Sequence, residues 1–596
     1  MEKWFIRNRK ANYALIAQQF GISEVTARIA VNRGISSNEE LKAYLHPSLN
    51  DLHEPRTMKH MEKAANIIKK KIEEGKKIRI IGDYDVDGVM STYILYTGLQ
   101  KCGADVDYEI PDRIKDGYGI NVMIVEAAAR DQIDTIVTCD NGIAAYDQIA
   151  RAKELGLTVV VTDHHDIPFQ EEDGQKVYRI PPADAIVNPK QHDCSYPMEG
   201  ICGAVVAFKL IQVLYDLCGI EKEAIEELLE FAAIATVCDV MDLTDENRTI
   251  VQYGLRKAEL TKNIGLRALI RENKLEDQHL SAYHFGFVVG PCINASGRLE
   301  SAKLALKLFL TKEEKAAEEY AKNLKLLNEE RKELTNEGIE KACELVESRY
   351  MDDSVLVVYL EHCHESIAGI IAGRIRERYN KPAIVLTDGE EHAKGSGRSI
   401  DEYPMFDKLN ECKELLLKFG GHPLAAGLSL KKENIDLLRE KLNEKAGLTE
   451  DDFIPKVSFD MVLPFEEVTY SLLQEFELLE PFGKSNEKPS FALKGVQLIN
   501  AKVIGKNKNM ARLTVKTQNS NRIFTAMLFR EFETFEELIR TKYGEEALIR
   551  LYEGTAENVY LDMIFYPSVN EFNGNTTIQF VIQHFRSAVR NKNFSQ

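Results

Sequence analysis

Residues 78–91, IRIIGDYDVDGVMS, join a short β-branched run to a turn crowded with negative charge. Three aspartates alternate there with uncharged residues, at Asp83, Asp85 and Asp87. An EF-hand calcium loop also opens D-x-D-x-D-G, but it needs a glutamate at its twelfth position and a helix before it. Here the twelfth position is Ile94, and the preceding residues have the composition of a buried strand. The EF-hand is rejected, and a strand that ends in a cluster of carboxylates is predicted.

The composition is that of an ordinary globular protein, with 44% hydrophobic and 29% charged residues. A chain of 596 residues is too long for one core, so three or four domains are expected. No apolar run reaches the roughly 20 residues of a membrane helix, and the start MEKWFIRNRK lacks the apolar segment of a signal peptide. Ten cysteines without a CxxC pair indicate reduced thiols. We therefore expect a cytoplasmic protein, and the net charge of −18 argues on average against a polyanionic partner.

Strands and helices alternate in the first half of the chain, which is typical of a parallel sheet with crossover helices. The predicted strands are Ile78–Ile81, Val106–Ile110, Thr135–Thr138, Thr158–Thr162 and Ala185–Val187. Asp140 follows the third of these strands, and Asp163, His164 and His165 follow the fourth. Ligands of open α/β sheets bind at the carboxyl ends of the strands. The acidic turn, Asp140 and the DHH triplet are therefore predicted to converge at one sheet edge.

This convergence indicates a metal site. A single aspartate after a strand is more often a turn former or a helix cap, and paired histidines are usually surface or core residues. Five or more carboxylates and two imidazoles at one edge would repel each other unless cations lay among them. Carboxylate oxygens with one imidazole suit Mn²⁺ or Mg²⁺. Two such ions, about 3.5–4 Å apart and bridged by a carboxylate, are the usual device for cleaving phosphate esters.

Several motifs together resemble those of the DHH phosphoesterase superfamily, in family order: GDYDVDG (82–88), CDNG (139–142), VTDHH (161–165), IATVCDVMDL (234–243) and FGGHPLAAGL (419–428). The residues within these motifs resemble those of the RecJ branch, the single-strand-specific 5′→3′ DNA exonucleases, and the resemblance covers nearly the whole chain. It implies a metal-dependent exonuclease that releases mononucleotides from single-stranded DNA in repair and recombination. It also implies a helicase and a single-strand-binding protein as candidate partners, a monomer, and no membrane partner.

The resemblance also implies residue roles. The metal ligands of the family fall on Asp85, Asp87, Asp140, His164 and Asp239, with Asp140 bridging both ions. His165 would face the scissile phosphate, and Asp83, close to the ligands, is placed with His165 in the catalytic step. Asp239 lies in the apolar run FAAIATVCDVM, where an unpaired carboxylate would be costly to bury.

The second half contains candidate nucleic-acid contacts. A charged helix over 312–348 is predicted to connect two lobes, and by resemblance a smaller α/β DHH-associated domain follows, with Gly-rich turns at GSGRS (395–399) and FGGH (419–422). Its candidate contacts, with two from the first lobe, are Arg113, Arg298, Arg374, Arg398 and His422. Relatives tend to carry Arg where this chain has Cys292, so any contact made there is in doubt.

From about residue 455, successive short strands with polar turns predict a β-barrel like an OB-fold. Between Lys494 and Arg530 there are eight basic residues and no acid. A basic run of this length fits a groove that tracks a single strand by charge and stacking. The predicted contacts in this run are Lys506, Lys508 and Arg512. Individually, such residues are more often solvated.

The predicted fold class is α/β, in five segments: an N-terminal helical segment (1–50), a parallel-sheet DHH catalytic domain (51–300), a connector helix (301–349), a DHH-associated domain (350–450) and an OB-like barrel (455–590). IAQQFGISEVTARI (16–29) has the pattern of a DNA-reading helix-turn-helix, but a packed αα-hairpin gives the same pattern and is preferred. Two alternatives to the exonuclease remain. One is a DHH phosphodiesterase for short oligonucleotides or cyclic dinucleotides, or a pyrophosphatase, and the other is a degenerate relative that only binds nucleic acid.

Overall fold

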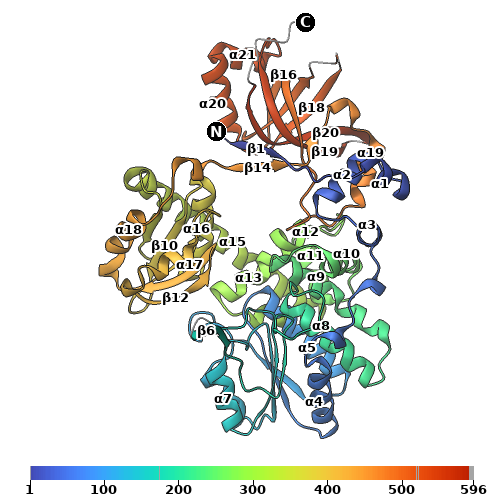
Figure 1. The fold of residues 1–596 in the computed structure, drawn as a ribbon, viewed down its shortest axis with the longest axis vertical. Helices are drawn as coiled ribbons and strands as arrows, with labels where there is room; N and C mark the ends of the chain where they lie inside the picture. The colour runs from blue at the N-terminus through green and yellow to red at the C-terminus, as the bar shows by residue number, and fades with distance from the viewer. Residues whose placement is uncertain (1, 173–174, 518–519, 521, 573, 589–596) are drawn as a thin grey trace. The chain divides into compact units, whose positions relative to one another are not determined.

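The computed structural model describes residues 2–172, 175–517, 520, 522–572 and 574–588. The chain divides into two compact units (Figure 1). One unit consists of residues 49–453, and the other joins the first 48 residues to the chain from residue 454 onward. None of the helices in the described ranges combines the length and the apolarity that a bilayer crossing requires.

The unit of residues 49–453 contains a five-stranded, all-parallel sheet in the order β3-β2-β4-β5-β8. Its strands are β2 (Ile78–Ile81), β3 (Val106–Glu109), β4 (Thr135–Cys139), β5 (Thr158–Thr162) and β8 (Ala185–Val187). One face packs against α4 (Met61–Glu73), α5 (Val86–Lys101) and α8 (Gly203–Leu217). The other face packs against α6 (Val122–Arg130) and α7 (Tyr146–Glu154). The sheet and its helices form what we call the first lobe, together with an antiparallel hairpin of β6 (Phe169–Glu172) and β7 (Gln175–Tyr178).

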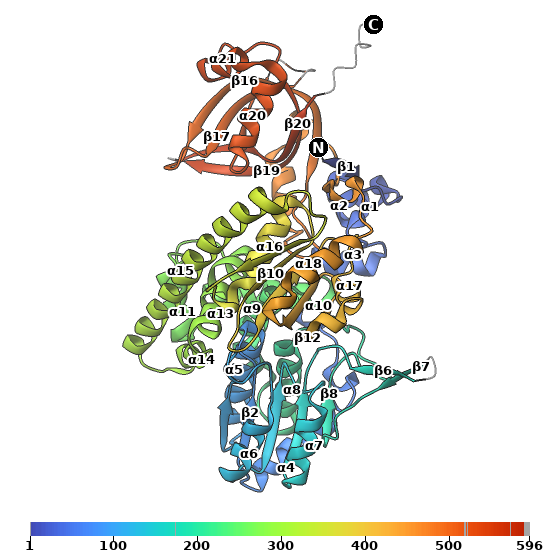
Figure 2. The same cartoon turned by 90° about the vertical axis from the view of Figure 1, so that its left-hand side faces the viewer.

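A helical layer completes this lobe. Its members are α9 (Leu229–Cys238), α10 (Asp245–Glu259), α11 (Ile264–Glu272), α12 (Ala282–His284), α13 (Gly290–Leu299) and α14 (Lys303–Leu310). The long charged helix predicted over 312–348 is α15 (Glu314–Leu345), followed by one π-helical turn. Figure 2 shows α15 lying alongside α11, α13 and α14, and its buried residues recur on one face. The helix is therefore packed along part of its length rather than wholly solvated.

The second lobe of the same unit is a five-stranded sheet in the order β12-β13-β11-β10-β9. Its strands are β9 (Leu356–Leu360), β10 (Ala383–Asp388), β11 (Ala393–Arg398), β12 (Leu416–His422) and β13 (Ala425–Leu430), and its helices are α16 (Ala368–Tyr379), α17 (Met405–Asn410) and α18 (Ile435–Glu444). The turns predicted at GSGRS and FGGH are wrong, because these residues lie in β11 and β12. Glycine serves close packing there: a Cβ on Gly395 would lie 2.4 Å from Leu386 Cδ2.

The other unit contains the barrel, with strands in the order β15-β16-β17-β18-β20-β19 and a β16–β19 pairing that closes it. The strands are β15 (Met461–Val462), β16 (Phe491–Ile504), β17 (Met510–Lys516), β18 (Ile523–Leu528), β19 (Tyr560–Phe572) and β20 (Asn575–Ser587). Three helices accompany them, α19 (Tyr470–Glu477), α20 (Phe532–Tyr543) and α21 (Glu545–Glu553). The predicted fold class, α/β lobes joined by a long helix plus a β-barrel, is confirmed.

The N-terminal segment packs within the barrel unit. Strand β1 (Lys3–Ile6) pairs in parallel with β14 (Lys456–Phe459), and three helices follow, α1 (Tyr13–Phe20), α2 (Glu24–Asn32) and α3 (Asn38–Leu45). The Glu475 carboxylate accepts hydrogen bonds from Ser23 and Thr26 at the start of α2. Arg33 forms a bidentate ion pair with the fully buried Asp460. The α1–α2 pair is therefore a packed αα-hairpin.

Candidate metal centre and anion-binding cleft

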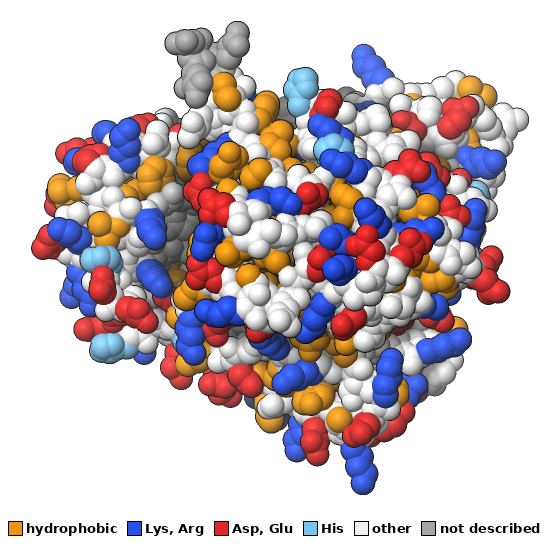
Figure 3. All heavy atoms as spheres, turned by 90° about the horizontal axis from the view of Figure 1, so that it is seen from below, with side chains coloured by type: hydrophobic (Ala, Val, Ile, Leu, Met, Phe, Trp, Pro, Cys, Tyr) orange, Lys and Arg blue, Asp and Glu red, His pale blue; other side chains and the backbone are white. Residues whose placement is uncertain are grey.

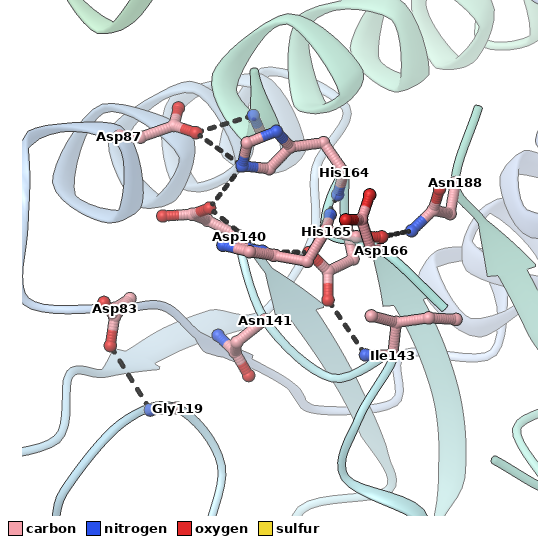
Figure 4. Close-up of polar contacts among 12 residues, drawn as sticks. Asp83, Asp87, Gly119, Asp140, Asn141, Ile143, His164, His165, Asp166 and Asn188 are labelled. Atoms are coloured by element: carbon pink, nitrogen blue, oxygen red, sulfur yellow. Dashed lines mark hydrogen bonds and ion pairs between the residues drawn. The ribbon is translucent and has the colours of Figure 1, made fainter. Parts of the chain in front are cut away.

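The acidic residues lie where the strand order of the parallel sheet reverses. From β2 the chain crosses to β3 on one side, whereas β4 lies on the other side of β2 and leads to β5. At such a switch point the two loops that leave neighbouring strands splay apart and open a crevice. The loop after β2 carries Asp83, Asp85 and Asp87, and the loop after β4 carries Asp140. Figure 4 shows the side chains of Asp83, Asp87 and Asp140 near one another beside the ends of the strands.

Backbone amides fix two of these carboxylates. Asp85 is the N-cap of α5, and its Oδ1 accepts a hydrogen bond from Gly88 N at 3.1 Å. Asp87 lies in the first turn of the same helix and accepts hydrogen bonds from Gly203 N at 2.6 Å and Ala204 N at 2.7 Å. Those two amides begin α8, so Asp87 lies at the positive end of a helix dipole. This arrangement stabilises the ionised carboxylate and fixes its orientation.

Asp140 has a left-handed backbone, with φ of 60°. This conformation is uncommon outside glycine, although Asp tolerates it better than most residues. The Tyr118 hydroxyl donates a hydrogen bond to the Asp140 carbonyl at 2.8 Å. A Cβ on Gly203 would lie 2.8 Å from Asp140 Cβ, so α8 approaches this turn closely. The strained turn thereby directs the Asp140 side chain toward His164, with 3.1 Å between Oδ1 and Nε2.

Asp163 organises both histidines and was not among the predicted site residues. Its Oδ1 accepts hydrogen bonds from His164 N at 2.8 Å, His165 N at 3.1 Å and His165 Nδ1 at 2.8 Å. Its Oδ2 accepts from Ile143 N at 2.8 Å. Asp163 is the first residue after β5, so its place at the carboxyl edge of the sheet is the sequence feature that could have identified it as a site residue. The hydrogen bonds within the DHH triplet itself could not be read from the pattern.

His164 lies among three carboxylates. Its Nε2 is 3.1 Å from Asp140 Oδ1, 3.5 Å from Asp87 Oδ2 and 3.7 Å from Asp239 Oδ2 (Figure 4 shows the first two). Asp239 caps the C-terminus of α9 rather than lying inside the helix, and its side chain is 30% exposed. Burial lowers the pKa of His164, which favours the neutral imidazole that binds metals.

Three overlapping groups of side chains have potential metal-ligand atoms within 4.8 Å of one another. The groups are Asp83, Asp85 and Asp140; Asp87, His164 and Asp239; and Asp140, His164 and His165. All five predicted ligands are therefore brought together, and Asp83 joins them. Asp83 is fully buried, and its Oδ2 has no hydrogen-bond partner among the described residues. The Oδ2 of Asp239 also lacks a hydrogen-bond donor within the described ranges.

The carboxylates oppose one another's ionisation. Burial, followed by the charges of neighbouring aspartates, raises the pKa of Asp83, Asp85 and Asp140. The same two causes raise the pKa of Asp239 to about 8. Such a cluster is costly when all its members are charged, and a bound cation removes the cost. Buried carboxylate oxygens without donors and one imidazole nitrogen form a donor set that fits Mn²⁺ or Mg²⁺.

His165 has a different environment from His164. Burial alone would lower the pKa of His165, but the hydrogen bond to Asp163 and the charges of Asp163, Asp87 and Asp239 together raise the pKa to about 9. The side chain is 44% exposed, and the Tyr118 hydroxyl lies 3.2 Å from its ring nitrogens. The imidazole is thus cationic at neutral pH and accessible, so it can donate a hydrogen bond to an anion beside the metal centre.

A cavity of about 910 Å³ adjoins the metal centre. Tyr84 and Tyr118 line it from the first lobe, and residues of α16, β11, β12 and β13 line it from the second lobe. Arg298, near the end of α13, also lines the cavity. The neighbouring Gly297 allows a close approach, because a Cβ there would lie 2.2 Å from the Tyr84 carbonyl oxygen. This contact places Arg298 beside the acidic loop.

Three arginines of this cavity lack acidic partners. Arg298 donates to the Ser366 carbonyl, Arg398 donates to Ser396 Oγ at 2.8 Å, and the Arg113 guanidinium stacks 4.7 Å from the Tyr84 ring centre. No carboxylate of a described residue lies within 4.0 Å of these guanidinium groups. Burial, then Arg113, lowers the pKa of Arg298 to about 10 and also lowers the pKa of Arg398. Unpaired cations that are partly buried together form a site for anions.

The other predicted contacts of this unit are placed less clearly. Arg374 lines the cavity but forms a 2.8 Å ion pair with Glu377. His422 is exposed at the end of the edge strand β12 and does not line the cavity. Cys292 is fully buried, and its thiol lies 3.2 Å from the Val288 carbonyl, so it makes no contact with the cleft surface.

In the other unit, the basic residues gather on the β16–β17 hairpin. Lys502 and Arg512 are directly opposite each other on the two strands, and both are exposed. Lys506 and Lys508 lie in the connecting turn. No carboxylate in the described part of the chain lies within 4.0 Å of these four side chains. Phe524, by contrast, packs against Phe465 in the barrel core.

Comparisons with known proteins agree with this geometry. Three family models match: the N-terminal domain of the DHH family over residues 77–236, the DHHA1 domain over 352–447 and the RecJ OB domain over 459–584. A single-stranded-DNA-specific exonuclease RecJ of Bacillus subtilis (strain 168) is 36% identical over 572 residues, covering 95% of this chain and 68% of the relative.

Solved structures of RecJ from Thermus thermophilus are also similar. The complex with Mn²⁺ matches with a TM-score of 0.80 and 25% identity, over 98% of this chain and 79% of the other. The complex with Mg²⁺ has a TM-score of 0.74 and 23% identity, over 98% and 78% of the two chains, and supports the fold. The chain belongs to the RecJ family of single-stranded-DNA-specific exonucleases.

Proposed function

We infer that the protein is a metal-dependent exonuclease that hydrolyses the phosphodiester bonds of single-stranded DNA and releases mononucleotides. The observation that carries this inference is the apposition of two opposite charge clusters. Carboxylates that can hold cations adjoin the cleft on the side of the first lobe. Arginines without acidic partners line the cleft, Arg113 and Arg298 beside the acidic loop and Arg398 on β11 of the second lobe. Tyr118 connects the cleft to the metal centre, because it lines the cleft and contacts both Asp140 and His165. A phosphate in this cleft would meet both.

We assign the ligand roles from the overlap of the ligand groups. Asp85, with Asp83 beside it, would hold one ion, and Asp87, His164 and Asp239 would hold the other. Asp140 belongs to groups on both sides and would bridge the ions. A pair of such ions supplies an activated water and Lewis-acid stabilisation of the phosphoryl oxygens.

The remaining residues orient the phosphate. His165, held by Asp163, would donate a hydrogen bond to a non-bridging oxygen and stabilise the charge that develops there. Arg298, beside the acidic loop, and Arg398, on β11 of the second lobe, would hold other oxygens of the phosphate. Asp163 would not touch the substrate, since its oxygens are already occupied by four donors of the chain itself.

The direction of degradation is a further proposal. We propose a 5′→3′ direction, which the family resemblance supports. A terminal phosphate can carry two negative charges, and the cleft offers several unpaired guanidinium groups near the metal centre to receive it. A role in DNA repair and recombination, action with a helicase and a single-strand-binding protein, and a monomer in the cytoplasm are proposed on the resemblance alone.

The test compares three substrates in the presence of Mn²⁺: a 5′-phosphorylated single strand of 30 nucleotides, a dinucleotide and pyrophosphate. We expect mononucleotides from the long strand at a rate far above that for the small substrates, and loss of a 5′ label before a 3′ label. Asp140→Asn should lower kcat by orders of magnitude without unfolding the protein. Wild-type turnover in this variant, or a preference for the dinucleotide or pyrophosphate, would contradict the proposal.

A further inference from the structure

A second, smaller cavity opens beside the cleft. It has a volume of about 320 Å³ and lies among α13, α15 and α16. It shares Phe287, Arg298, Ile370 and Arg374 with the larger cavity, so the two are adjacent. None of the residues that line only the smaller cavity belongs to the metal centre described above.

The part of α15 that lines this cavity is cationic, although the helix as a whole is rich in glutamate. Helix α15 carries nine glutamates between its ends. The α15 residues that line the cavity nevertheless include no acid, and they recur with helical spacing at Arg331, Lys332, Thr335, Asn336 and Ile339. With Arg298 and Arg374, four cations and no carboxylate line the cavity. By contrast, cationic and anionic side chains are interspersed on the face of the molecule drawn in Figure 3.

The Arg331 side chain is held in place by uncharged groups. Its Nε and Nη2 donate to Asn328 Oδ1 at 3.1 and 3.0 Å. Asn328 is only 3% exposed, and its Nδ2 donates in turn to Cys292 Sγ at 3.6 Å. Within the described ranges, no carboxylate lies within 4.0 Å of Arg331 or Lys332. The outer edge of the guanidinium therefore remains available to an anion.

The burial of the Arg331 charge has a cost that no carboxylate of a described residue offsets within 4.0 Å. Burial, together with the nearby Arg374, lowers the pKa of Arg331, so the charged form is disfavoured where it stands. No glutamate lies three or four residues from Arg331 on α15, so the sequence offers it no ion pair along the helix. Arg331 instead turns toward Asn328 and the cavity. A fixed, unpaired and partly buried guanidinium is a feature typical of phosphate recognition.

We propose that this cavity is a nucleotide-binding subsite in which Arg331 and Lys332 hold a phosphate group. The volume lies at the lower end of the range of about 300–1,000 Å³ seen for small-molecule sites and matches a single nucleotide. The inference rests on the proposed function, because the subsite adjoins the cleft that would hold the strand. The phosphate has two possible sources, a nucleotide of the bound strand or a released 5′-mononucleotide.

The test measures equilibrium binding to the full-length protein in EDTA, so that no hydrolysis occurs. The probes are 5′-dTMP and a 5′-phosphorylated dT12 strand, titrated by calorimetry and by fluorescence anisotropy. The test variant is Arg331→Gln combined with Lys332→Gln, and Arg331→Lys is the conservative variant. Lys322→Gln is the matched control, because it removes an exposed charge from α15 outside either cavity. Circular dichroism and thermal unfolding confirm that each variant is folded.

If the subsite holds a nucleotide of the strand, the double variant should bind dT12 at least tenfold more weakly, with its dTMP affinity unchanged. The slope of log K against log salt should also fall by about 0.7, since one single-strand phosphate contact is lost. If the subsite holds the free mononucleotide, the dTMP affinity should fall at least tenfold and the dT12 slope should stay constant. Lys322→Gln should leave all of these quantities unchanged.

Unchanged dTMP affinity, dT12 affinity and salt slope in the folded double variant would overturn the proposal. The same holds if Lys322→Gln reduced binding as much as the double variant does. The outcome is independent of the exonuclease assignment. A wild-type protein that bound these probes through Arg331 and Lys332, but released no nucleotide with Mn²⁺, would contradict the proposed function and leave the subsite standing.

Discussion

The facing pair of Lys502 and Arg512 leads to a prediction in which stability and binding change in opposite directions. These residues are directly opposite on the antiparallel strands β16 and β17, and both are exposed. Like charges in this position destabilise a sheet, by an amount similar to the roughly 0.2–1 kcal/mol that a favourable cross-strand pair contributes. A repulsive pair that stabilises nothing in the fold is expected where an anion binds.

The substitution Lys502→Glu converts this repulsion into attraction. We expect a gain of about 0.5 kcal/mol in the free energy of unfolding, which is half the upper value for such pairs. In a unit of about 150–250 residues, 1 kcal/mol moves Tm by roughly 2–4 °C, so the transition of the barrel unit should rise by about 1–2 °C.

Binding of single-stranded DNA should weaken in the same variant. Two unit charges 4 Å apart in water interact by about 1 kcal/mol. Losing one attraction and gaining one repulsion therefore costs about 2 kcal/mol, which screening at 0.1 M salt reduces. We expect Kd for a dT30 strand to rise by about tenfold. The salt slope should fall by roughly 0.7 or more, since one phosphate contact is lost.

The assay combines differential scanning calorimetry with anisotropy titrations of dT30 between 50 and 300 mM salt. Lys542→Glu is the control, because it makes the same charge change on the exposed face of α20 in the same unit. That variant should change Kd and the slope much less. If Lys502→Glu bound dT30 with wild-type affinity and salt slope, the hairpin would not be a strand-binding surface. A lower Tm would show that the facing charges do not repel.

Three further predictions concern the metal centre. In EDTA, Tm should fall as pH rises from 5 to 8 and should recover on addition of Mn²⁺ at pH 8. The reason is that burial raises the pKa of Asp239 to about 8 in the folded state, whereas its unfolded value is 3.8. Between these two values the folded state binds more protons than the unfolded state, so it loses stability as pH rises. A metal-free Tm that is constant or rises over this range would exclude repulsion in the cluster. His165→Ala should keep near-normal Mn²⁺ affinity by calorimetry but lose roughly 10²–10⁴-fold in kcat; abolished metal binding there, with binding retained in His164→Ala, would exchange the two roles. Asp163→Asn should lower kcat and shift the basic limb of the pH–rate profile toward lower pH, because the hydrogen bond that raises the pKa of His165 is weakened; an unchanged profile would show that Asp163 has only a structural role.

Much of the metal centre could be predicted because its determinants are local. Each ligand-bearing turn directly follows a short β-branched strand, and the parallel order of those strands brings their carboxyl ends to one edge. Asp85, Asp87, Asp140 and His164 are therefore placed by strand periodicity together with the family motifs. The apolar run that ends at Asp239 is likewise a helix with the ligand at its end.

Other parts depend on contacts that a linear pattern does not contain. The amides of Gly203 and Ala204, more than a hundred residues away in the chain, donate hydrogen bonds to Asp87. Periodicity and composition do not predict a contact of this kind. The glycines of β11 and β12 were misread as turns because glycine also occurs where strands pack closely. The sequence predicts only a connector helix around Arg331. Its pattern does not show that Arg331 and Lys332 face a cavity that the glutamates of α15 do not line.

The net charge of −18 first argued against a polyanionic partner, and the structure explains why that argument fails. Many of the acids are committed, either to the metal centre or to ion pairs with nearby lysines and arginines. Groups of cations without such partners occur in the cleft, in the adjoining cavity and on the β16–β17 hairpin. A phosphate responds to the charges within about one Debye length, about 8 Å at physiological salt, and not to the sum over the chain. Because exposed charges farther away are screened, an acidic average favours solubility and leaves local cationic surfaces free to bind a single strand.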